Sequence, residues 1–483
     1  MSSSIESATV APARPAKLTG AAALALTIIV SCELMVMLDG TIMNVALPEI
    51  RGGLGFTPSG LSWVSTAFLL AYGGLMLLGG RAGDIVGRRR VFLTGIVIFT
   101  AASLAGGLAT GPTWLITARA VQGLGAALAA PSTMALLITN FQGALQAKAL
   151  SIYSSVTASA MTLGLVLGGI ITSTLSWRWV LFVNIPLGLF VLLFAPRFVE
   201  ESPSRPGRLD LGGALTSVLG LVAVTFGLVR TAEHGWDDPA SLAALAAGTV
   251  LVVAFVLIET KAKQPVMPLR LFADRTRAGA FAVLLLIPMV TLSMQFLIIQ
   301  FLQEVLGKSA WQSGLAFLPM AIGMLLTAQN ATKAIAKIGA RSTALLGMVL
   351  LGAGIGWLVP LAAGTGYLTG IAGPMLLLGA GLGLVVVPFN IAIMSTADPS
   401  ESGAAAGVLQ TAMLTGASLG IAVASTVYAS VIKDYGPLDR PSAEAMADGM
   451  GSAFTVSLGI VVLAFLIVLF TLKNETAEHE TAG

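Results

Sequence analysis

Residues 19–44, TGAAALALTIIVSCELMVMLDGTIMN, decide the fold of this chain. About 20 predominantly apolar residues suffice for a helix to cross the hydrocarbon core of a bilayer, and only Glu33 and Asp39 carry charge in this stretch. It is too long for a secretory signal, and no small-x-small cleavage site follows it, so we expect it to be retained. The stretch therefore predicts a membrane-spanning helix.

Thirteen further stretches have a similar composition, and none alternates apolar and polar residues with the period of two that a transmembrane β-barrel requires. The sequence thus predicts an all-α membrane protein with 14 transmembrane helices. The remaining expected helices cover residues 62–80, 91–109, 114–138, 149–174, 179–198, 211–229, 242–258, 278–303, 311–329, 342–360, 369–393, 404–430 and 452–472.

The composition supports a lipid-facing surface and excludes several kinds of chemistry. Of the 483 residues, 56% are hydrophobic and only 10% are charged, against roughly 25% charged residues in an average soluble domain. Two histidines and one cysteine are too few for a His/Cys zinc site, an iron–sulfur cluster or an internal disulfide. The sequence has no phosphate-binding loop or nucleophile elbow, so we expect no cofactor, no metal, no ATP-driven transport and no enzyme. The net charge of +3 gives no support for nucleic-acid binding.

The distribution of Lys and Arg predicts the orientation. With both termini in the cytoplasm, 19 of the 26 basic residues fall in inner segments and six in outer segments, while Arg119 lies within a helix. The positive-inside rule predicts such a bias. We therefore expect a multi-pass protein of the cytoplasmic membrane with both termini cytoplasmic.

The chain divides into two similar halves around an inserted helical hairpin. Ser-Gly-Leu opens the helices near residues 59 and 313, and parallel repeats of this kind are typical of transporters, with the substrate site at the repeat interface. The predicted organisation is a disordered cytoplasmic N-terminus (1–18), a first six-helix bundle (19–198), a linker with transmembrane helices 7 and 8 (199–276), a second six-helix bundle (277–472) and a cytoplasmic tail (473–483).

Charged residues deep within the spans are candidates for function, because burying a charge in hydrocarbon is costly. Only Glu33, Asp39 and Arg119 lie there. Glu33 and Asp39 are six positions apart on one helix, about 240° around its axis, so they point to different sides. We expect at least one of the acids to titrate in a water-filled cavity, with Arg119 tuning it. The alternative is a purely structural buried ion pair.

Glycines and uncharged polar residues supply further candidates. Gly164 and Gly168 are four positions apart, a spacing that lets helix backbones approach closely, either as static packing or as a sliding contact during transport. The candidate residues for a substrate cavity are Asn44, Gln122, Gln303 and Asn390.

Five motifs resemble the major facilitator superfamily, and specifically its fourteen-helix drug:proton antiporter family. They run from the first expected helix into the tenth and so cover much of the chain. The matching segments are LDGTIMNVALP (38–48), GRAGDIVGRRR (80–90), RAVQGLG (119–125), WRW (177–179) with Phe182, Asn184, Pro186 and Gly188, and LQ (302–303) with Gly307 and GLAFLP (314–319).

This resemblance implies roles for residues of the motifs. Asp39 would take the role of the helix-one acid, and Arg119 that of an arginine coupled to proton movement; Glu33 precedes the matching segment. An inner gate would include Gly80, Asp84, Gly87, Arg88 and Arg89, with Asp84 near the start of a second-half helix that begins near Gly403.

One motif departs from the family pattern. The helix-five motif would comprise Gly164, Gly168 and Gly169, but Leu165 stands where the family usually has a proline. A proline there would bend the helix, so the bend is not assured in this chain.

The resemblance implies a proton-coupled efflux transporter that exports amphipathic organic compounds such as drugs, antibiotics or lipophilic cations. Its expected partners are the small-molecule substrate, protons and the lipid bilayer, and we expect a monomer. The alternatives are an exporter of a lipid or an endogenous metabolite, and a proton-independent facilitator or ligand sensor.

Overall fold

The computed structural model describes residues 20–202, 210–262, 265, 267–396, 402–435 and 441–472. Over these residues the regular structure is helical throughout, without a β-strand. The predicted disorder of residues 1–18 and the predicted tail 473–483 lie outside the described residues, as does part of the linker loops.

The first half of the chain supplies seven helical segments for six expected spans. They are α1 (Gly20–Leu54), α2 (Pro58–Val86), α3 (Arg88–Gly107), α4 (Pro112–Asn140), α5 (Gly143–Thr174), α6 (Arg178–Phe182) and α7 (Asn184–Phe198). The linker supplies α8 (Leu211–His234) and α9 (Pro239–Lys261), followed by the 3-10 turn η1 (Leu269–Phe272).

The second half begins with α10 (Arg275–Gln300), which continues into the π-helical turn η2 (Phe301–Val305). The remaining elements are α11 (Ala310–Leu315), α12 (Leu318–Ile338), α13 (Ala340–Leu358), α14 (Tyr367–Gly370), α15 (Ala372–Thr396), α16 (Ser402–Tyr435) and α17 (Ala443–Thr471).

All 14 expected stretches coincide with helices, although several helices are longer than expected. Thirteen helical segments among the described residues are long and apolar enough to cross a membrane. The remaining expected span, 149–174, falls on α5, whose apolar part Leu163–Thr174 is shorter. The helical count is therefore consistent with 14 spans.

Prolines explain why three expected helices are broken near the outer end of a span. Pro186, Pro319 and Pro374 each lack the N–H that would bond to the carbonyl four residues earlier. The helix boundaries fall just before them, between α6 and α7, between α11 and α12, and between α14 and α15. The first of these breaks makes Asn184 the first residue of α7.

Glycines set the close packing inside each half. A Cβ on Gly125 of α4 would lie 2.6 Å from the backbone nitrogen of Phe99 in α3, and a Cβ on Gly79 of α2 would collide with the Ala127 carbonyl of α4. In the second half, Gly379 of α15 similarly faces the Met320 carbonyl of α12. Only a residue without a side chain allows such approaches.

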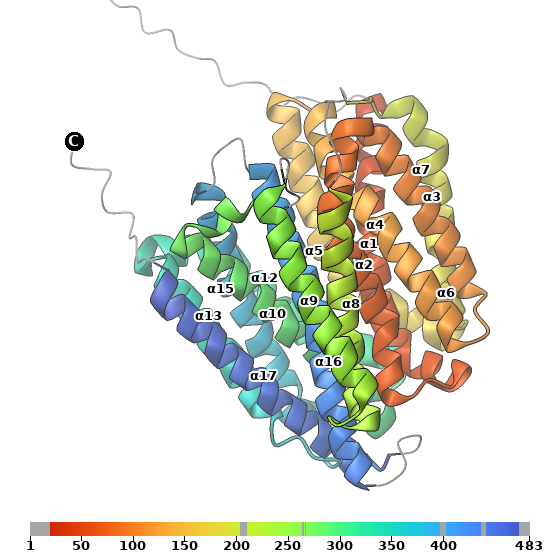
Figure 1. Cartoon of the computed structure of the whole chain (residues 1–483), viewed down its shortest axis with the longest axis vertical. Helices are drawn as coiled ribbons and strands as arrows, with labels where there is room; N and C mark the ends of the chain where they lie inside the picture. Colours follow the sequence, from red (N-terminus) through yellow and green to blue (C-terminus); the bar gives the residue numbers. More distant parts are fainter. Residues whose placement is uncertain are drawn as a thin grey trace, which may run out of the picture.

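The two halves meet along α2 and α16, and the linker hairpin lies over this line. Gly73 of α2 packs on Leu414 of α16. Helix α8 contacts both, since its Val218 packs on Gly74 of α2 and the Thr426 hydroxyl of α16 donates to its Leu228 carbonyl at 2.9 Å. In Figure 1 the hairpin of α8 and α9 stands in front of the seam between the first-half helices and the second-half helices.

Candidate functional site

Asp39 is the centre of a buried polar network in the first half. Its carboxylate pairs with the Arg119 guanidinium of α4 and accepts hydrogen bonds from the Gln122 amide at 2.7 Å and from the Asn184 amide at 2.8 Å. Asp39, Gln122 and Asn184 have no exposed surface, and Arg119 is 1% exposed. Three helices (α1, α4 and α7) therefore converge on one carboxylate.

Arg119 makes further contacts that fix its guanidinium in place. Its Nε donates to the Val64 carbonyl of α2 at 3.0 Å, and its Nη1 donates to the Gln122 carbonyl oxygen at 2.6 Å. The Phe68 ring lies 4.3 Å from the guanidinium carbon, a cation–π contact. Ser103 of α3 accepts from the Gln122 amide at 2.9 Å. The network thus also ties α2 and α3 to Asp39.

This geometry corrects one expectation about Asp39. We expected an acid in a water-filled cavity, but in this conformation the Asp39 side chain is fully enclosed. The groups around it are polar rather than aliphatic, because Arg119, Gln122 and Asn184 all direct donors at its two oxygens. A buried carboxylate is tolerated when a counter-charge and donors replace its hydration.

Glu33 occupies a separate site on α1, closer to the N-terminal end of the helix than Asp39. It is 4% exposed and hydrogen-bonded to the hydroxyls of Tyr153 and Thr157 on α5. Among the described residues no Lys, Arg or His lies within ion-pairing distance of it, in contrast to Asp39. The two acids therefore point to different sides of α1, as their spacing predicted.

The loop between α2 and α3 forms a compact structure on the side that the sequence predicts to face the cytoplasm. Asp84 pairs with Arg88, and Gly87 has φ of +112°, a conformation that favours glycine. Glu201, just after α7, accepts from the backbone N–H of Arg89 at 2.8 Å and of Arg90 at 3.2 Å. It therefore caps the N-terminus of α3, where a negative charge is favourable.

For two expected members of the inner gate, Gly80 and Asp84, the described residues show no contact that supports the expected role. Gly80 is in α2, where a Cβ would only touch Pro131 at 3.6 Å, so no close approach requires glycine there. Asp84 is predicted to contact the start of the helix near Gly403. Residues 397–401 and the side chains at this helix start lie outside the described part of the chain.

The helix-five glycines pack in the outer half of the molecule. Gly164 lies against Thr41 of α1, and a Cβ on Gly168 would lie 2.9 Å from the Ile42 Cα. Gly169 faces the backbone of Trp311 in α11, which belongs to the second half. The motif therefore brings α5 against α1 and across the interface between the halves.

Two polar contacts also close the outer end of this interface. Arg51, at the end of α1, forms an ion pair of 2.8 Å with Glu304 in η2. The neighbouring Gln303 donates its amide to the Val45 carbonyl of α1 at 3.0 Å. These contacts join the two halves at the C-terminal end of α1, on the side that the sequence predicts to face outward.

The four polar residues expected to line a substrate cavity are engaged at separate places. Gln122 belongs to the Asp39 network and Gln303 to the outer contact. Asn44 accepts from the Ser65 hydroxyl at 3.1 Å, and Asn390 donates to the Val386 carbonyl in its own helix at 2.9 Å. Their role in a substrate cavity stays a prediction.

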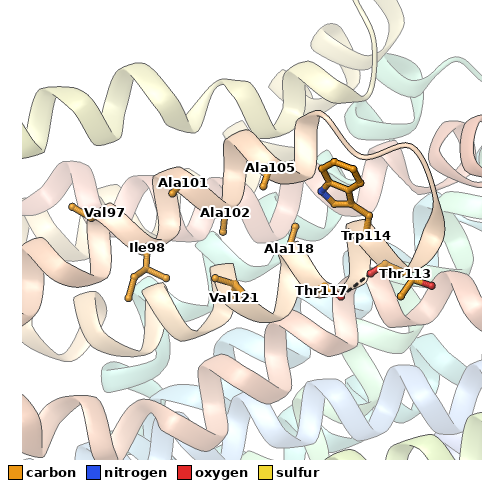
Figure 2. A pocket seen from close by; sticks show the side chains of 10 residues that line it. All are labelled: Val97, Ile98, Ala101, Ala102, Ala105, Thr113, Trp114, Thr117, Ala118 and Val121. Carbon is orange, nitrogen blue, oxygen red and sulfur yellow. Dashed lines mark hydrogen bonds between the residues drawn. The ribbon is translucent and has the colours of Figure 1, made fainter.

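A surface groove with a volume of about 640 Å³ lies between α3 and α4 (Figure 2). Alanine and valine side chains line most of it, and Trp114 at one end is 50% exposed. Its residues Ala118 and Val121 each precede a network residue by one position, about 100° around α4, so groove and network lie on different sides of the helix. The groove is an apolar feature of the surface of α3 and α4, separate from Asp39.

Sequence reasoning missed several residues of these sites. Asn184 was noted only as part of a motif, and Ser103, Glu201 and Glu304 gave no signal of their own. The position of Asn184 two residues before Pro186 is the one local clue, because a proline in the first turn predicts a helix start and so places this side chain at a break. The others become visible only through long-range contacts.

Comparison with known proteins shows relatives along nearly the whole chain. Residues 29–421 match the family model described as Major Facilitator Superfamily. The cephamycin export protein CmcT of Amycolatopsis lactamdurans is 38% identical over 459 residues, covering 94% of this chain and 92% of that protein. The puromycin resistance protein pur8 of Streptomyces alboniger is 35% identical over 470 residues, covering 95% of this chain and 93% of that protein.

Solved structures show the same fold at low sequence identity. A bacterial homolog of the human lysosomal transporter Spinster, in an inward-facing and unoccupied conformation, superposes with a TM-score of 0.65 and 15% identity, covering 95% of this chain and 99% of that one. The D-xylose-proton symporter superposes with a TM-score of 0.64 and 13% identity, covering 94% and 99%.

Proposed function

Because the chain belongs to the major facilitator superfamily of membrane transporters, we propose that it exports amphipathic organic compounds of the antibiotic class in exchange for protons. It is a transporter rather than an enzyme. The single observation that carries the proton coupling is the buried pair of Asp39 and Arg119, which holds a titratable group at the centre of the first half.

The named relatives support the class of substrate. One is an export protein for cephamycin and another confers resistance to puromycin, and each matches more than nine-tenths of this chain. The two compounds differ in chemistry, so the shared scaffold accommodates organic molecules of several kinds. We infer an amphipathic antibiotic-like substrate for this chain on that basis.

Protonation of Asp39 would change the network that joins four helices to α1. As a carboxylate it balances the Arg119 charge and accepts three donors. A neutral acid removes that balance and leaves an uncompensated guanidinium in a buried site, which costs several kcal/mol unless the helices rearrange. Loading a proton from the outer side therefore favours a different arrangement of α1 and α4.

The driving force is sufficient for concentrative export. Each net positive charge that moves inward contributes about 2.3 kcal/mol per 100 mV of membrane potential. Since about 1.4 kcal/mol corresponds to a tenfold ratio, this potential supports roughly a fifty-fold substrate gradient. We place the exchange in the cytoplasmic membrane, with both termini cytoplasmic, and expect the single chain to be the working unit because Asp39 and its partners belong to one chain.

Glu33 is the second acid in this proposal. It has hydroxyl partners but no described counter-charge, so it would attract a cationic group of the substrate or a second proton. The inner loop, with its Asp84–Arg88 pair and Glu201 cap, would act as the cytoplasmic gate. The role of Glu33 follows from the burial of its charge. The role of the inner loop follows from paired charges that a conformational change would separate.

Reconstituted vesicles provide the test. An imposed pH gradient should drive export of a dye or antibiotic substrate, and a protonophore should abolish it. Asp39→Asn keeps the side-chain shape but cannot release a proton, so we expect pH-driven export to fall at least about tenfold, with binding of substrate retained. Asp237→Asn, at an exposed position between α8 and α9, is the matched control and should export normally.

The proposal fails if Asp39→Asn and Glu33→Gln both leave pH-driven export intact. Export that continues undiminished in the presence of the protonophore would instead indicate a proton-independent facilitator.

A further inference from the structure

Asn184 has an unsatisfied buried oxygen directly beside the proposed proton site. Its Nδ2 donates to Asp39 at 2.8 Å and approaches the Ser103 hydroxyl at 3.4 Å, while its Oδ1 has no hydrogen-bond partner. The residue has no exposed surface. A buried carbonyl oxygen without a donor costs about 1–3 kcal/mol. We therefore looked for a second state of the site in which this oxygen has a donor.

The surroundings of Asp39 suit a carboxylate and not a carboxylic acid. Arg119, Gln122 and Asn184 present only N–H donors to its two oxygens. A protonated Asp39 would itself carry an O–H donor and would need an acceptor. With the present orientation of these side chains, its O–H would point at another donor.

The possible acceptors around Asp39 can be compared one by one. The Gln122 carbonyl oxygen already accepts from Arg119 at 2.6 Å, and the Ser103 oxygen accepts from Gln122 at 2.9 Å. The Val64 carbonyl accepts from the Nε of Arg119. Each of these oxygens thus already has a donor, whereas the Oδ1 of Asn184, on the side chain that already contacts Asp39, has none among the described residues.

We propose that Asn184 is a positioning residue that reads the protonation state of Asp39 by exchanging the two ends of its amide. With Asp39 ionised, Nδ2 donates to the carboxylate; with Asp39 protonated, the amide turns so that Oδ1 accepts the acid's O–H. In the first state the Oδ1 of Asn184 has no partner, and in the second state its Nδ2 has none. The number of unsatisfied amide groups therefore stays the same. This inference rests on the proposed titration of Asp39 and names the residue that responds to it.

Asn184 is suited to carry this change to the rest of the molecule. It is the first residue of α7, directly after Val183, which separates α6 from α7, and its amide turns about a side-chain bond without any change of the backbone. The charged groups facing the site are Asp39 from α1 and Arg119 from α4, while α2, α3 and α7 contribute the Val64 carbonyl, Ser103 and Asn184. No other charged side chain of the described residues pairs with this network.

Infrared difference spectroscopy between high and low pH tests the exchange in the reconstituted full chain. With isotope-labelled asparagine, acidification should shift one amide carbonyl band to lower wavenumber, because an unbonded oxygen gains a donor. That band should be absent in Asn184→Leu. The same spectra should show a protonated carboxyl band that disappears in Asp39→Asn.

The pH dependence of the carboxyl band separates Asn184 from a simple donor. Gln122→Leu is the matched variant, because Gln122 donates to the same Asp39 oxygen and its own oxygen is already occupied. Gln122→Leu removes a hydrogen bond that stabilises only the ionised form of Asp39. In this variant the pH midpoint of the carboxyl band should therefore rise by about one unit or more. Asn184→Leu should raise it clearly less, because both protonation states lose a bond.

The outcomes distinguish the two proposals. If Asp39→Asn removes no pH-dependent carboxyl band, the proposed function itself is wrong. If Asp39 titrates but the wild-type amide band does not move, or if Asn184→Leu raises the midpoint as much as Gln122→Leu, Asn184 is a fixed donor and the exchange is wrong. The amide band is measured on the wild-type protein, so the test does not depend on a variant that folds.

Discussion

At the scale of single residues, the molecule depends on how a few charges are buried. Asp39 and Arg119 neutralise each other in a buried site, whereas Glu33 has hydroxyl partners and, among the described residues, no basic one. Removing one member of a buried pair is far more destabilising than removing both, because the remaining charge has lost its counter-ion. The pair is therefore a measurable element of stability as well as of function.

Arg119→Leu should lower the free energy of unfolding by about 3–5 kcal/mol, because it leaves the Asp39 charge buried and unpaired. Adding Asp39→Leu to this variant should recover a substantial part of the loss. The measurement is thermal unfolding of purified protein in detergent, at a pH near neutrality. Equal stability of the Arg119→Leu variant and the wild type would show that the pair makes no net contribution.

At the scale of elements, glycines decide how closely helices pack. Gly169 of α5 lies against the Trp311 backbone of α11, so that a side chain at this position would push the two halves apart at their outer ends. A Cβ on Gly356 of α13 would meet no atom of the described chain within 4 Å. The two positions are thus a matched pair of helical glycines with opposite surroundings.

Gly169→Val should reduce export by at least about tenfold, because the backbone of Trp311 cannot move aside as a flexible side chain would. Gly356→Ala should leave export unchanged and the stability equal or slightly raised, since alanine favours a helix more than glycine does. Vesicle export and thermal unfolding measure both variants. Normal export by Gly169→Val would mean that the outer contact is not needed for transport.

The linker hairpin is held by a charged cap. Asp238 precedes α9 and accepts from the Ser241 backbone N–H at 2.8 Å and from Arg230 of α8 at 2.7 Å. The hydrogen bond from Arg230, with those from Ser241, holds the pKa of Asp238 below its ordinary value of 3.8. A carboxyl whose pKa is lowered by folding stabilises the folded state above its ordinary pKa and loses that effect as the pH falls.

The α8–α9 connection should therefore be insensitive to pH above about 3.8 and should loosen as the pH falls below it. Trp236, which is 63% exposed in this connection, supplies a local fluorescence probe. In Asp238→Asn the dependence should vanish over the same range. A wild-type signal that changes between neutral pH and about pH 5 instead would assign the transition to another group.

At the scale of the whole molecule, several contacts join the two halves at the ends that the sequence predicts to face outward. The Arg51–Glu304 ion pair, the Gln303–Val45 hydrogen bond and the contact of Gly169 with α11 all cross between the halves at their outer ends. Glu304 lies in the π-helical turn, a distortion often found at functional sites. Transport to the outside requires these contacts to separate.

Removing the ion pair should favour the outward-open state. In a Cys32→Ser background, which has no cysteine, spin labels on the outer ends of α2 and α12 would report the distance between the halves. Glu304→Gln should enlarge the fraction of long distances. The reversed pair Arg51→Glu with Glu304→Arg should restore the wild-type distribution, and failure to restore it would show that the effect is not electrostatic.

The helical architecture and the principal charges could be predicted from the sequence, because both are local properties. A run of about 20 apolar residues forms a membrane-spanning helix whatever its neighbours are, and the rare charges inside such runs are visible as exceptions. For this reason the helical stretches, the family, and Asp39, Glu33 and Arg119 as notable residues all followed from the sequence. The breaks in three of the helices were not predicted, although a proline lies just after each of them.

The partners of these residues were decided only by the tertiary structure. Asn184 lies 145 positions from Asp39, Glu201 lies 112 from Arg89, and Glu304 lies 253 from Arg51. Uncharged polar residues are common in helices and acids are common in loops, so nothing in their local sequence marks them. The enclosure of Asp39 was likewise missed, because whether a buried charge meets water or hydrogen-bond donors depends on how several helices pack around it.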